Sequence, residues 1–88
     1  MTPKRSTNSI VNRVELRELR ALVAVADHDS FRAGAAALGY TQSAVSHQIA
    51  ELERAAGTSL FTRPGGRGRI RLTPAGEAAY RHARRALA

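Results

Sequence analysis

Residues Tyr40–Arg54 read Y-T-Q-S-A-V-S-H-Q-I-A-E-L-E-R, and the rest of the chain is best understood from this stretch. At about 100° per residue, an α-helix would gather Val45, Ile49 and Leu52 on one apolar side. The opposite side is polar, and its members are Ser43, His47, Ala50 and Arg54, with Ser46 on the flank. The apolar side suits a hydrophobic core. The polar side suits a groove of DNA, but an ordinary amphipathic surface helix has the same pattern, so other segments must decide between the two.

The residues before this helix predict a shorter helix and a tight turn. Ser30 can cap a helix over residues 31–38, and Gly39 can end it in the left-handed conformation that is common at helix C-termini. Thr41 can cap the longer helix, because its hydroxyl can accept a hydrogen bond from an early backbone N–H. The link Leu38–Thr41 therefore has the length and the glycine of a helix-turn-helix connection.

A first helix is expected to begin near Asn12, because Glu15 three residues later completes the pattern of a capping box, and to run through Asp27. Gly34, inside the second helix, costs about 1 kcal/mol relative to alanine, which indicates close packing against a neighbour. Large apolar residues are few, so each is expected to contribute to the core. They are Leu16, Leu19, Leu22, Val23, Val25, Leu38, Val45, Ile49, Leu52, Leu60, Phe61, Ile70 and Leu72.

Beyond the long helix the pattern changes from helical to extended. Residues 59–63 and 69–73 read as two short strands, the second with period-two alternation, and the basic, glycine-rich loop Pro64–Gly68 joins them. Thr73 and Pro74 then begin a last helix, with proline at its first position. We therefore predict a mainly α fold: a winged helix-turn-helix with a three-helix core, a two-stranded β-hairpin wing and a C-terminal linker helix.

Charge indicates the class of partner. The 88 residues carry a formal charge of +7, with thirteen arginines and one lysine, which favours nucleic acid first and an anionic membrane surface second. The chain is long enough for one domain. It has no cysteine, so disulfides and thiolate metal sites are excluded. Its longest apolar run, Ala21–Ala26, is too short for a membrane span, and no signal peptide is recognisable, so we expect a cytoplasmic protein.

Catalytic, metal and cofactor sites are not expected. Ser46 and His47 are adjacent on a helix and point about 100° apart, so they do not form a nucleophile–base pair. The three histidines lack ligand spacing, and Pro64–Gly68 lacks the Lys-Ser/Thr of a phosphate-binding loop. Two other binding functions stay open. The Arg-Gly-rich loop could hold RNA or a single strand, although aromatic residues for stacking are few, and the last helix could mediate protein interactions.

Over about Val14–Leu87 the sequence resembles the N-terminal winged helix-turn-helix domain of LysR-type transcriptional regulators. The resemblance rests on an ordered set of short motifs rather than on any one of them. They are Leu16-Arg17-Glu18-Leu19, Val23-Ala24-Val25-Ala26, Ser30-Phe31, Ala35-Ala36-Ala37-Leu38, Thr41-Gln42-Ser43-Ala44-Val45-Ser46, Gln48-Ile49, Leu52-Glu53, Gly57, Leu60-Phe61, Arg63 and Arg71-Leu72-Thr73-Pro74-Ala75-Gly76.

This resemblance implies sequence-specific binding of double-stranded DNA as a dimer, in the cytoplasm of a bacterium and at its nucleoid. The helix over about 41–55 would enter the major groove, and the residues implied to read bases are Gln42, Ser43, Ser46 and His47. Residues expected to meet phosphate or the minor groove are Ser30, Arg32, Thr41, Arg54, Arg63, Arg67 and Arg69. Arg63 matches the wing arginine of the family, whereas Ser30 and Thr41 place helix N-termini where phosphate could bind.

The polar, basic N-terminal residues lack helical or strand periodicity and are expected to form a flexible tail (1–12). The resemblance divides the remainder into the DNA-binding domain (13–73) and a linker or dimerisation helix (74–88). Residues expected to face a second subunit are Ala75, Ala79, His82, Ala83 and Ala86. The wing from Phe61 to Thr73 is about two residues longer than the family pattern. The large effector-binding domain of the family is absent, so a small-molecule effector is expected only if a missing C-terminal domain exists.

Overall fold

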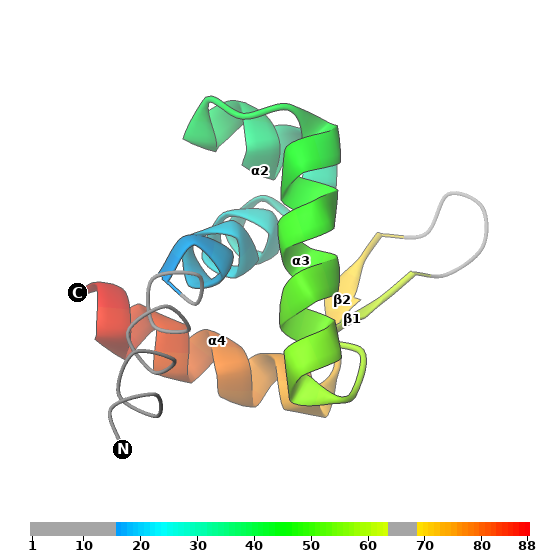
Figure 1. The fold of residues 1–88 in the computed structure, drawn as a ribbon, viewed down its shortest axis with the longest axis vertical. Coiled ribbons are helices and arrows are strands. Elements are labelled where there is room, and N and C mark those ends of the chain that lie inside the picture. Colours follow the sequence, from blue (N-terminus) through cyan, green and yellow to red (C-terminus); the bar gives the residue numbers. More distant parts are fainter. Residues whose placement is uncertain (1–15, 64–68) are drawn as a thin grey trace, which may run out of the picture.

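The computed structural model describes residues 16–63 and 69–88 (Figure 1). Residues 16–28 form a first helix. It is followed by α2 (Phe31–Leu38), α3 (Gln42–Ala56), β1 (Phe61–Thr62), β2 (Arg71–Leu72) and α4 (Pro74–Leu87). The two strands form an antiparallel hairpin at one side of α3, and α4 leads away from β2 toward the C-terminus. This is the predicted architecture of a helical core with a two-stranded wing.

The helix-turn-helix is confirmed at the predicted residues. Three hydroxyls cap helices by accepting a hydrogen bond from the backbone N–H three residues on, at 3.0 Å for Ser30, 3.1 Å for Thr41 and 3.0 Å for Thr73. Gly39 and Gly57 end α2 and α3 in the left-handed region, at φ of 76° and 74°. Local side-chain chemistry therefore sets both ends of α2 and of α3.

The wing is a hairpin as predicted, but its strands are shorter than residues 59–63 and 69–73. The ladder pairs Phe61 with Leu72 and Thr62 with Arg71, two residues on each strand. Beyond this ladder, Thr73 makes two hydrogen bonds to the segment that precedes β1. Its N–H donates to the Leu60 carbonyl at 2.9 Å, and its hydroxyl donates to the Ser59 carbonyl at 2.8 Å. The ladder stops there because Thr73 already caps α4. The tail 1–12, the cap near Asn12, and Arg67 within loop 64–68 lie outside the described residues.

The core lies between the first helix, α2, α3, β1 and α4. Its buried apolar residues are Leu19, Ala21, Leu22, Val25, Ala35, Val45, Ile49, Leu60, Phe61 and Ala83. The other residues predicted for the core pack against this cluster from its edge, with one exception. Leu16 is 43% exposed, so its prediction was wrong. It lies one turn before Leu19, beyond the elements of the described chain that cover Leu19 and Leu22.

Two glycines allow backbones to touch. A Cβ at Gly34 would lie 2.9 Å from the Val25 Cα and N atoms, so α2 crosses the first helix in direct backbone contact, as the sequence predicted. A Cβ at Gly76 would lie 2.0 Å from the Leu60 carbonyl oxygen. The first turn of α4 therefore packs on the segment that enters the wing, and no side chain fits between them.

The first helix ends in a strained residue. Asp29 has φ of 54°, and it is the non-glycine residue of the described chain with positive φ. The turn is closed by the Ser30 N–H, which donates to the Val25 carbonyl at 3.3 Å. This turn sets the angle at which α2 leaves the first helix.

Candidate nucleic-acid interface

The N-terminal half of α3 has the two unlike sides that the sequence predicted. Val45 and Ile49 are fully buried. The predicted base-reading residues are all exposed, and they are Gln42, Ser43, Ser46 and His47. Because these buried residues pack α3 against the core, the opposite, polar side of the helix faces solvent in a fixed orientation.

One flank of this polar side adjoins the base of the wing. A hollow of about 270 Å³ is lined by Phe31 of α2, by Gln42, Ser46 and Ala50 of α3, and by Arg63 at the end of β1. The structure thus brings the predicted wing arginine beside two of the predicted base-reading residues, although 17 positions separate Ser46 from Arg63 in the chain. The polar side of α3 and the Arg63 guanidinium share one continuous surface here.

Contacts on two sides hold the Arg63 side chain. Its guanidinium carbon lies 4.9 Å from the centroid of the Phe31 ring, and its Nη2 lies 3.8 Å from Oε1 of Glu53. The Phe31 ring is itself fixed by an edge contact with Phe61, at 5.7 Å between centroids. The Arg63 side chain is still 54% exposed, so it is oriented without being withdrawn from solvent.

Glu53 joins α3 to the wing, a role that sequence reasoning missed. Its Oε2 accepts hydrogen bonds from the backbone N–H of Leu60 at 2.8 Å and of Phe61 at 3.4 Å, while its other oxygen faces Arg63. The side chain is only 18% exposed. The available signal was an acid at the edge of the apolar side of the helix, seven residues before a predicted strand residue.

The other flank of α3 faces the first helix. A hollow of about 370 Å³ there is lined by Arg17, Glu18, Ala44, His47, Gln48 and Glu51. Glu51 is central to this flank, because its Oε2 forms an ion pair with Arg54 and lies 3.9 Å from Nε2 of His47. Sequence reasoning assigned His47 and Arg54 to the interface, but it did not predict the carboxylate between them.

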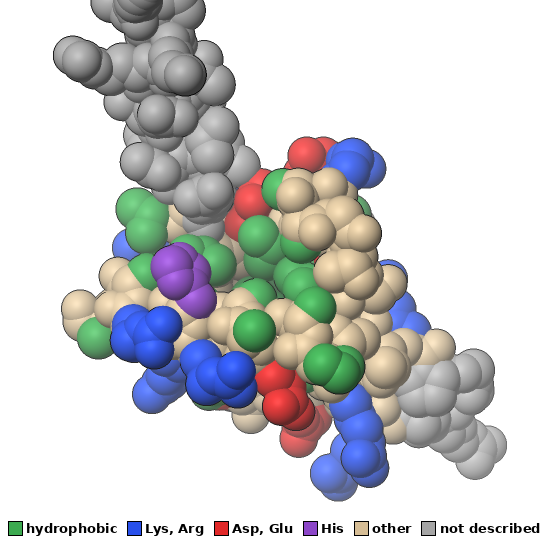
Figure 2. All heavy atoms as spheres, turned by 90° about the horizontal axis from the view of Figure 1, so that it is seen from below, with side chains coloured by type: hydrophobic (Ala, Val, Ile, Leu, Met, Phe, Trp, Pro, Cys, Tyr) green, Lys and Arg blue, Asp and Glu red, His purple; other side chains and the backbone are tan. Residues whose placement is uncertain are grey.

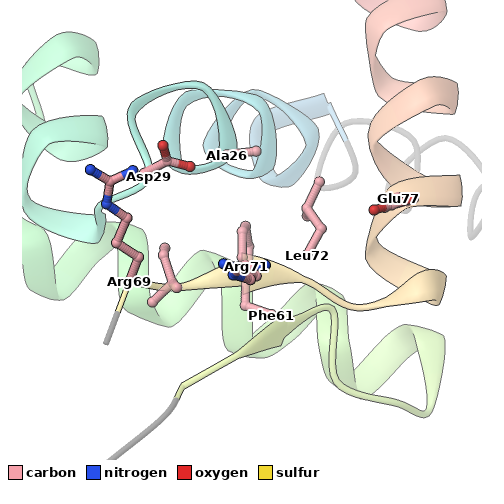
Figure 3. A pocket seen from close by; sticks show the side chains of 8 residues that line it. Ala26, Asp29, Phe61, Arg69, Arg71, Leu72 and Glu77 are labelled. Atoms are coloured by element: carbon pink, nitrogen blue, oxygen red, sulfur yellow. The ribbon is translucent and has the colours of Figure 1, made fainter. Parts of the chain in front are cut away.

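The predicted phosphate-contacting residues lie in different surroundings. Arg32 is exposed in the first turn of α2. The hydroxyls of Ser30 and Thr41 already accept capping hydrogen bonds, which leaves their hydrogens available to a phosphate oxygen. Arg69 lines a separate hollow of about 410 Å³, formed by the end of the first helix, β2 and α4, where its side chain is directed toward Asp29 (Figure 3). Arg69 and Arg63 therefore line different hollows.

The predicted dimerisation residues of α4 divide into two groups. Ala75 and Ala79 pack against the core of this chain, and Ala83 has no exposed surface at all. This corrects the predicted set, because Ala83 fills the core of its own subunit and offers nothing to a partner. His82 and Ala86 are exposed. The space-filling view from the α4 side shows basic side chains gathered near the C-terminal end of the helix (Figure 2).

A polar contact fastens the middle of α4 to the first helix. The Tyr80 hydroxyl donates to Oδ1 of Asp27 at 2.6 Å, and Nη1 of Arg84 lies 3.7 Å from Oδ2 of the same carboxylate. The hydrogen bond to Asp27 raises the pKa of Tyr80, since it favours the protonated phenol. Together with the Gly76 contact, this fixes α4 against the domain at two points.

Membrane-spanning helices and clusters of metal-binding side chains are absent from the described ranges. None of the helices in residues 16–63 and 69–88 has the length and apolarity needed to cross a membrane. In the same ranges, no cluster of three or more His, Cys, Asp or Glu side chains is arranged to hold a metal ion.

A helix-turn-helix whose second helix is backed by the core, followed by a two-stranded hairpin and a further helix, defines the winged helix-turn-helix class of proteins. Within this class, residues 16–77 match the family described as "Bacterial regulatory helix-turn-helix protein, lysR family". The chain belongs to this LysR family. The predicted resemblance is thereby confirmed, and the alternative of RNA or single-strand binding through the Arg-Gly-rich loop gains no support.

Similar proteins agree with this assignment. The HTH-type transcriptional regulator PtxR of Pseudomonas aeruginosa is 43% identical over 77 residues, which are 88% of this chain and 24% of PtxR. BudR of Klebsiella aerogenes is 49% identical over 75 residues, 85% of this chain and 51% of BudR. The DNA-binding domain of BenM, solved in a complex with catB site 1 DNA, has a TM-score of 0.76 and 39% identity, covering 82% of this chain and 78% of that one. The chain spans about a quarter to a half of the length of the two regulators it matches.

Proposed function

We propose that this chain binds double-stranded DNA with sequence specificity, as a LysR-type transcriptional regulator or as part of one. The observation that carries the proposal is the polar side of α3, which is exposed, held from behind by Val45 and Ile49, and flanked by the anchored Arg63. The solved domain of BenM bound to DNA has this fold and supports the same role. Relatives with this fold regulate transcription, so the function assigned to the chain is binding and not catalysis.

In this proposal α3 enters the major groove. Gln42 can form a bidentate pair with adenine, the serine hydroxyls can serve bases or phosphates, and His47 can donate to guanine. Arg63 reaches the flanking minor groove, whose negative potential increases where it narrows. Arg32 and Arg54 contact phosphates, and these contacts position the domain without reading sequence. The wing residues Arg67 and Arg69 belong to the same phosphate set, with Arg69 approaching DNA from its own side of the hairpin.

We further propose that the DNA-bound form is a homodimer through the exposed side of α4. His82 and Ala86 lie on that side, together with the exposed Arg81 and Arg85. The core contacts of Ala75, Ala79 and Ala83 support this arrangement indirectly, because they fix which side of α4 is left for a partner. A small-molecule effector would need the additional length that the relatives have. A regulator of this kind acts in the bacterial cytoplasm, at the nucleoid.

Selection of bound duplexes from a random pool tests the function directly. We expect a dyad-symmetric preferred site, because two subunits read two half-sites. Neutralising about six phosphates should give a slope near −5 for log affinity against log salt. Enrichment of no sequence, or binding that does not weaken with salt, would contradict the proposal.

Substitutions separate sequence reading from general attraction. Gln42→Ala should cost about 1–3 kcal/mol on the selected duplex and little on random DNA. Arg63→Ala should weaken binding to both, with some loss of preference for A·T-rich flanks. If Gln42→Ala weakens both duplexes equally, Gln42 does not read a base. Sedimentation at several concentrations, with and without DNA, tests the dimer; a strict monomer under all these conditions would remove the partner role of α4.

A further inference from the structure

Glu51 is an acid on a helix surface that otherwise suits an anionic partner. Its side chain is 41% exposed, and one oxygen, Oε2, faces both Arg54 and His47. Arg54 pairs with it from one turn further along α3, and Nε2 of His47 lies 3.9 Å away from one turn earlier. The second acid of this part of α3, Glu53, is occupied by the wing backbone and by Arg63.

Both side chains that face Glu51 belong to the proposed DNA surface. The side chains of His47 and Arg54 are 73% and 65% exposed, so either could turn toward DNA. While Arg54 is paired with the Glu51 carboxylate, a phosphate can bind Arg54 only by displacing that carboxylate. The displaced carboxylate would then lie unpaired close to the phosphates, and like charges repel.

This competition affects random and preferred sequences differently. On random DNA the affinity depends mainly on contacts between cationic side chains and phosphates. Pairing of Arg54 with Glu51 removes one such contact and therefore weakens the complex. On a preferred site the base contacts fix the position of α3. There the domain cannot shift along DNA to bring Arg54 onto a phosphate, so freeing Arg54 gains less affinity than it does on random DNA. Glu51 therefore weakens the random complex more than the preferred one.

We propose that Glu51 is a specificity-determining residue of this interface, because it withholds Arg54 from phosphate. This inference rests on the proposed function, since it concerns the same DNA-binding surface. It differs from the base-reading assignments because Glu51 acts through its neighbours and needs no contact with DNA.

The test is Glu51→Gln, which keeps the shape of the side chain and removes its charge. Affinity is measured across a range of salt concentrations for two duplexes of equal length, the one selected from the random pool and one of random sequence. The random duplex should bind about three- to tenfold more tightly, with a salt slope steeper by about one, because one more cation reaches phosphate. The selected duplex should gain less affinity, so the ratio of the affinity for the selected duplex to that for the random duplex falls.

Two controls distinguish a local effect of Glu51 on Arg54 from a general effect of net charge. Glu77→Gln changes the net charge by the same amount in the first turn of α4, away from His82 and Ala86, and should leave the ratio unchanged. Adding Arg54→Ala to Glu51→Gln should abolish the gain on random DNA, and thermal unfolding confirms that each variant is folded. Equal changes on both duplexes, or the same shift from Glu77→Gln, would overturn the inference. If the unaltered chain binds neither duplex, the proposed function itself fails, whereas duplex binding with an unchanged ratio in Glu51→Gln overturns the role of Glu51 alone.

Discussion

Removing the Glu53 carboxylate should loosen the wing from α3 in a graded way. The Glu53→Gln variant keeps an oxygen that can accept from the Leu60 N–H, but the bond loses its charge. The ion pair with Arg63 is also lost; it contributes at most about 1 kcal/mol, because Arg63 is more than half exposed. We expect Glu53→Gln to lower the free energy of unfolding by about 1 kcal/mol. Glu53→Ala leaves the partly buried Leu60 N–H without a partner and should cost about 2–3 kcal/mol.

Chemical denaturation and thermal unfolding measure both variants. In a domain of this size 1 kcal/mol corresponds to about 4–8 °C, so Glu53→Ala should lower Tm by about 10 °C or more. Glu51→Gln is the control on the same helix, because its ion pairs are exposed and should contribute about 0.5 kcal/mol or less. A Glu53→Ala variant within about 0.5 kcal/mol of the unaltered chain would refute the reasoning, since a surface substitution alone produces that much.

A double-mutant cycle separates the two contributions to this loss of stability, the ion pair with Arg63 and the hydrogen bonds to the wing backbone. If Arg63→Ala and Glu53→Gln are combined, the coupling energy should be about 1 kcal/mol or less. Most of the loss in Glu53→Ala should then persist when Arg63 is absent, because the backbone hydrogen bonds carry it. A coupling as large as the whole loss would show instead that the ion pair holds the wing.

Other predictions concern the turns and α4. Gly76→Ala should destabilise the fold by about 2 kcal/mol or more although alanine is the better helix former, because the new Cβ would meet the Leu60 carbonyl oxygen; a more stable variant in denaturant would contradict this packing. Asp29→Gly should raise the free energy of unfolding by about 1 kcal/mol, since glycine adopts positive φ without strain, and a loss of stability in the same measurement would argue against that strain. The raised pKa of Tyr80 favours the neutral phenol in the folded state. The contribution of the Tyr80–Asp27 hydrogen bond to the free energy of unfolding is therefore fully present below the ordinary tyrosine pKa of about 10, and it is lost as pH rises through the higher folded value. Ultraviolet titration of a variant in which Tyr80 is the single tyrosine should show this, and Asp27→Asn should move the midpoint down; an unmoved midpoint would exclude the hydrogen bond as the cause.

The helix-turn-helix could be predicted almost to the residue because its limits are set locally. Ser30 and Thr41 cap with their own hydroxyls, and Gly39 accepts a left-handed conformation, so each signal lies within a few residues of its effect. The apolar spacing of Val45 and Ile49 likewise fixes which side of α3 is buried. These are the features that short-range chemistry determines.

Features that depend on distant parts of the chain were missed or misassigned. Glu53 reads in the sequence as an ordinary helix acid, and its role appears only when α3 and β1 lie side by side. An alanine seam has the same pattern whether it packs within a subunit or between subunits, so Ala83 was assigned to the wrong contact. Leu16 fitted the apolar spacing, but spacing does not show how far the covering elements extend.

The attachments of α4 tie its whole length to the domain. At 1.5 Å per residue, about 6 Å of helix separates Gly76, which contacts the Leu60 carbonyl oxygen, from Tyr80 at the Asp27 contact, and about 10 Å more leads to Leu87. Ala83 and Leu87 pack against the core over that second stretch, so α4 cannot pivot about Tyr80. A displacement of the end of α4 would therefore carry the core and the wing entry with it, and the hairpin that leads to Arg63 would move as part of one rigid body.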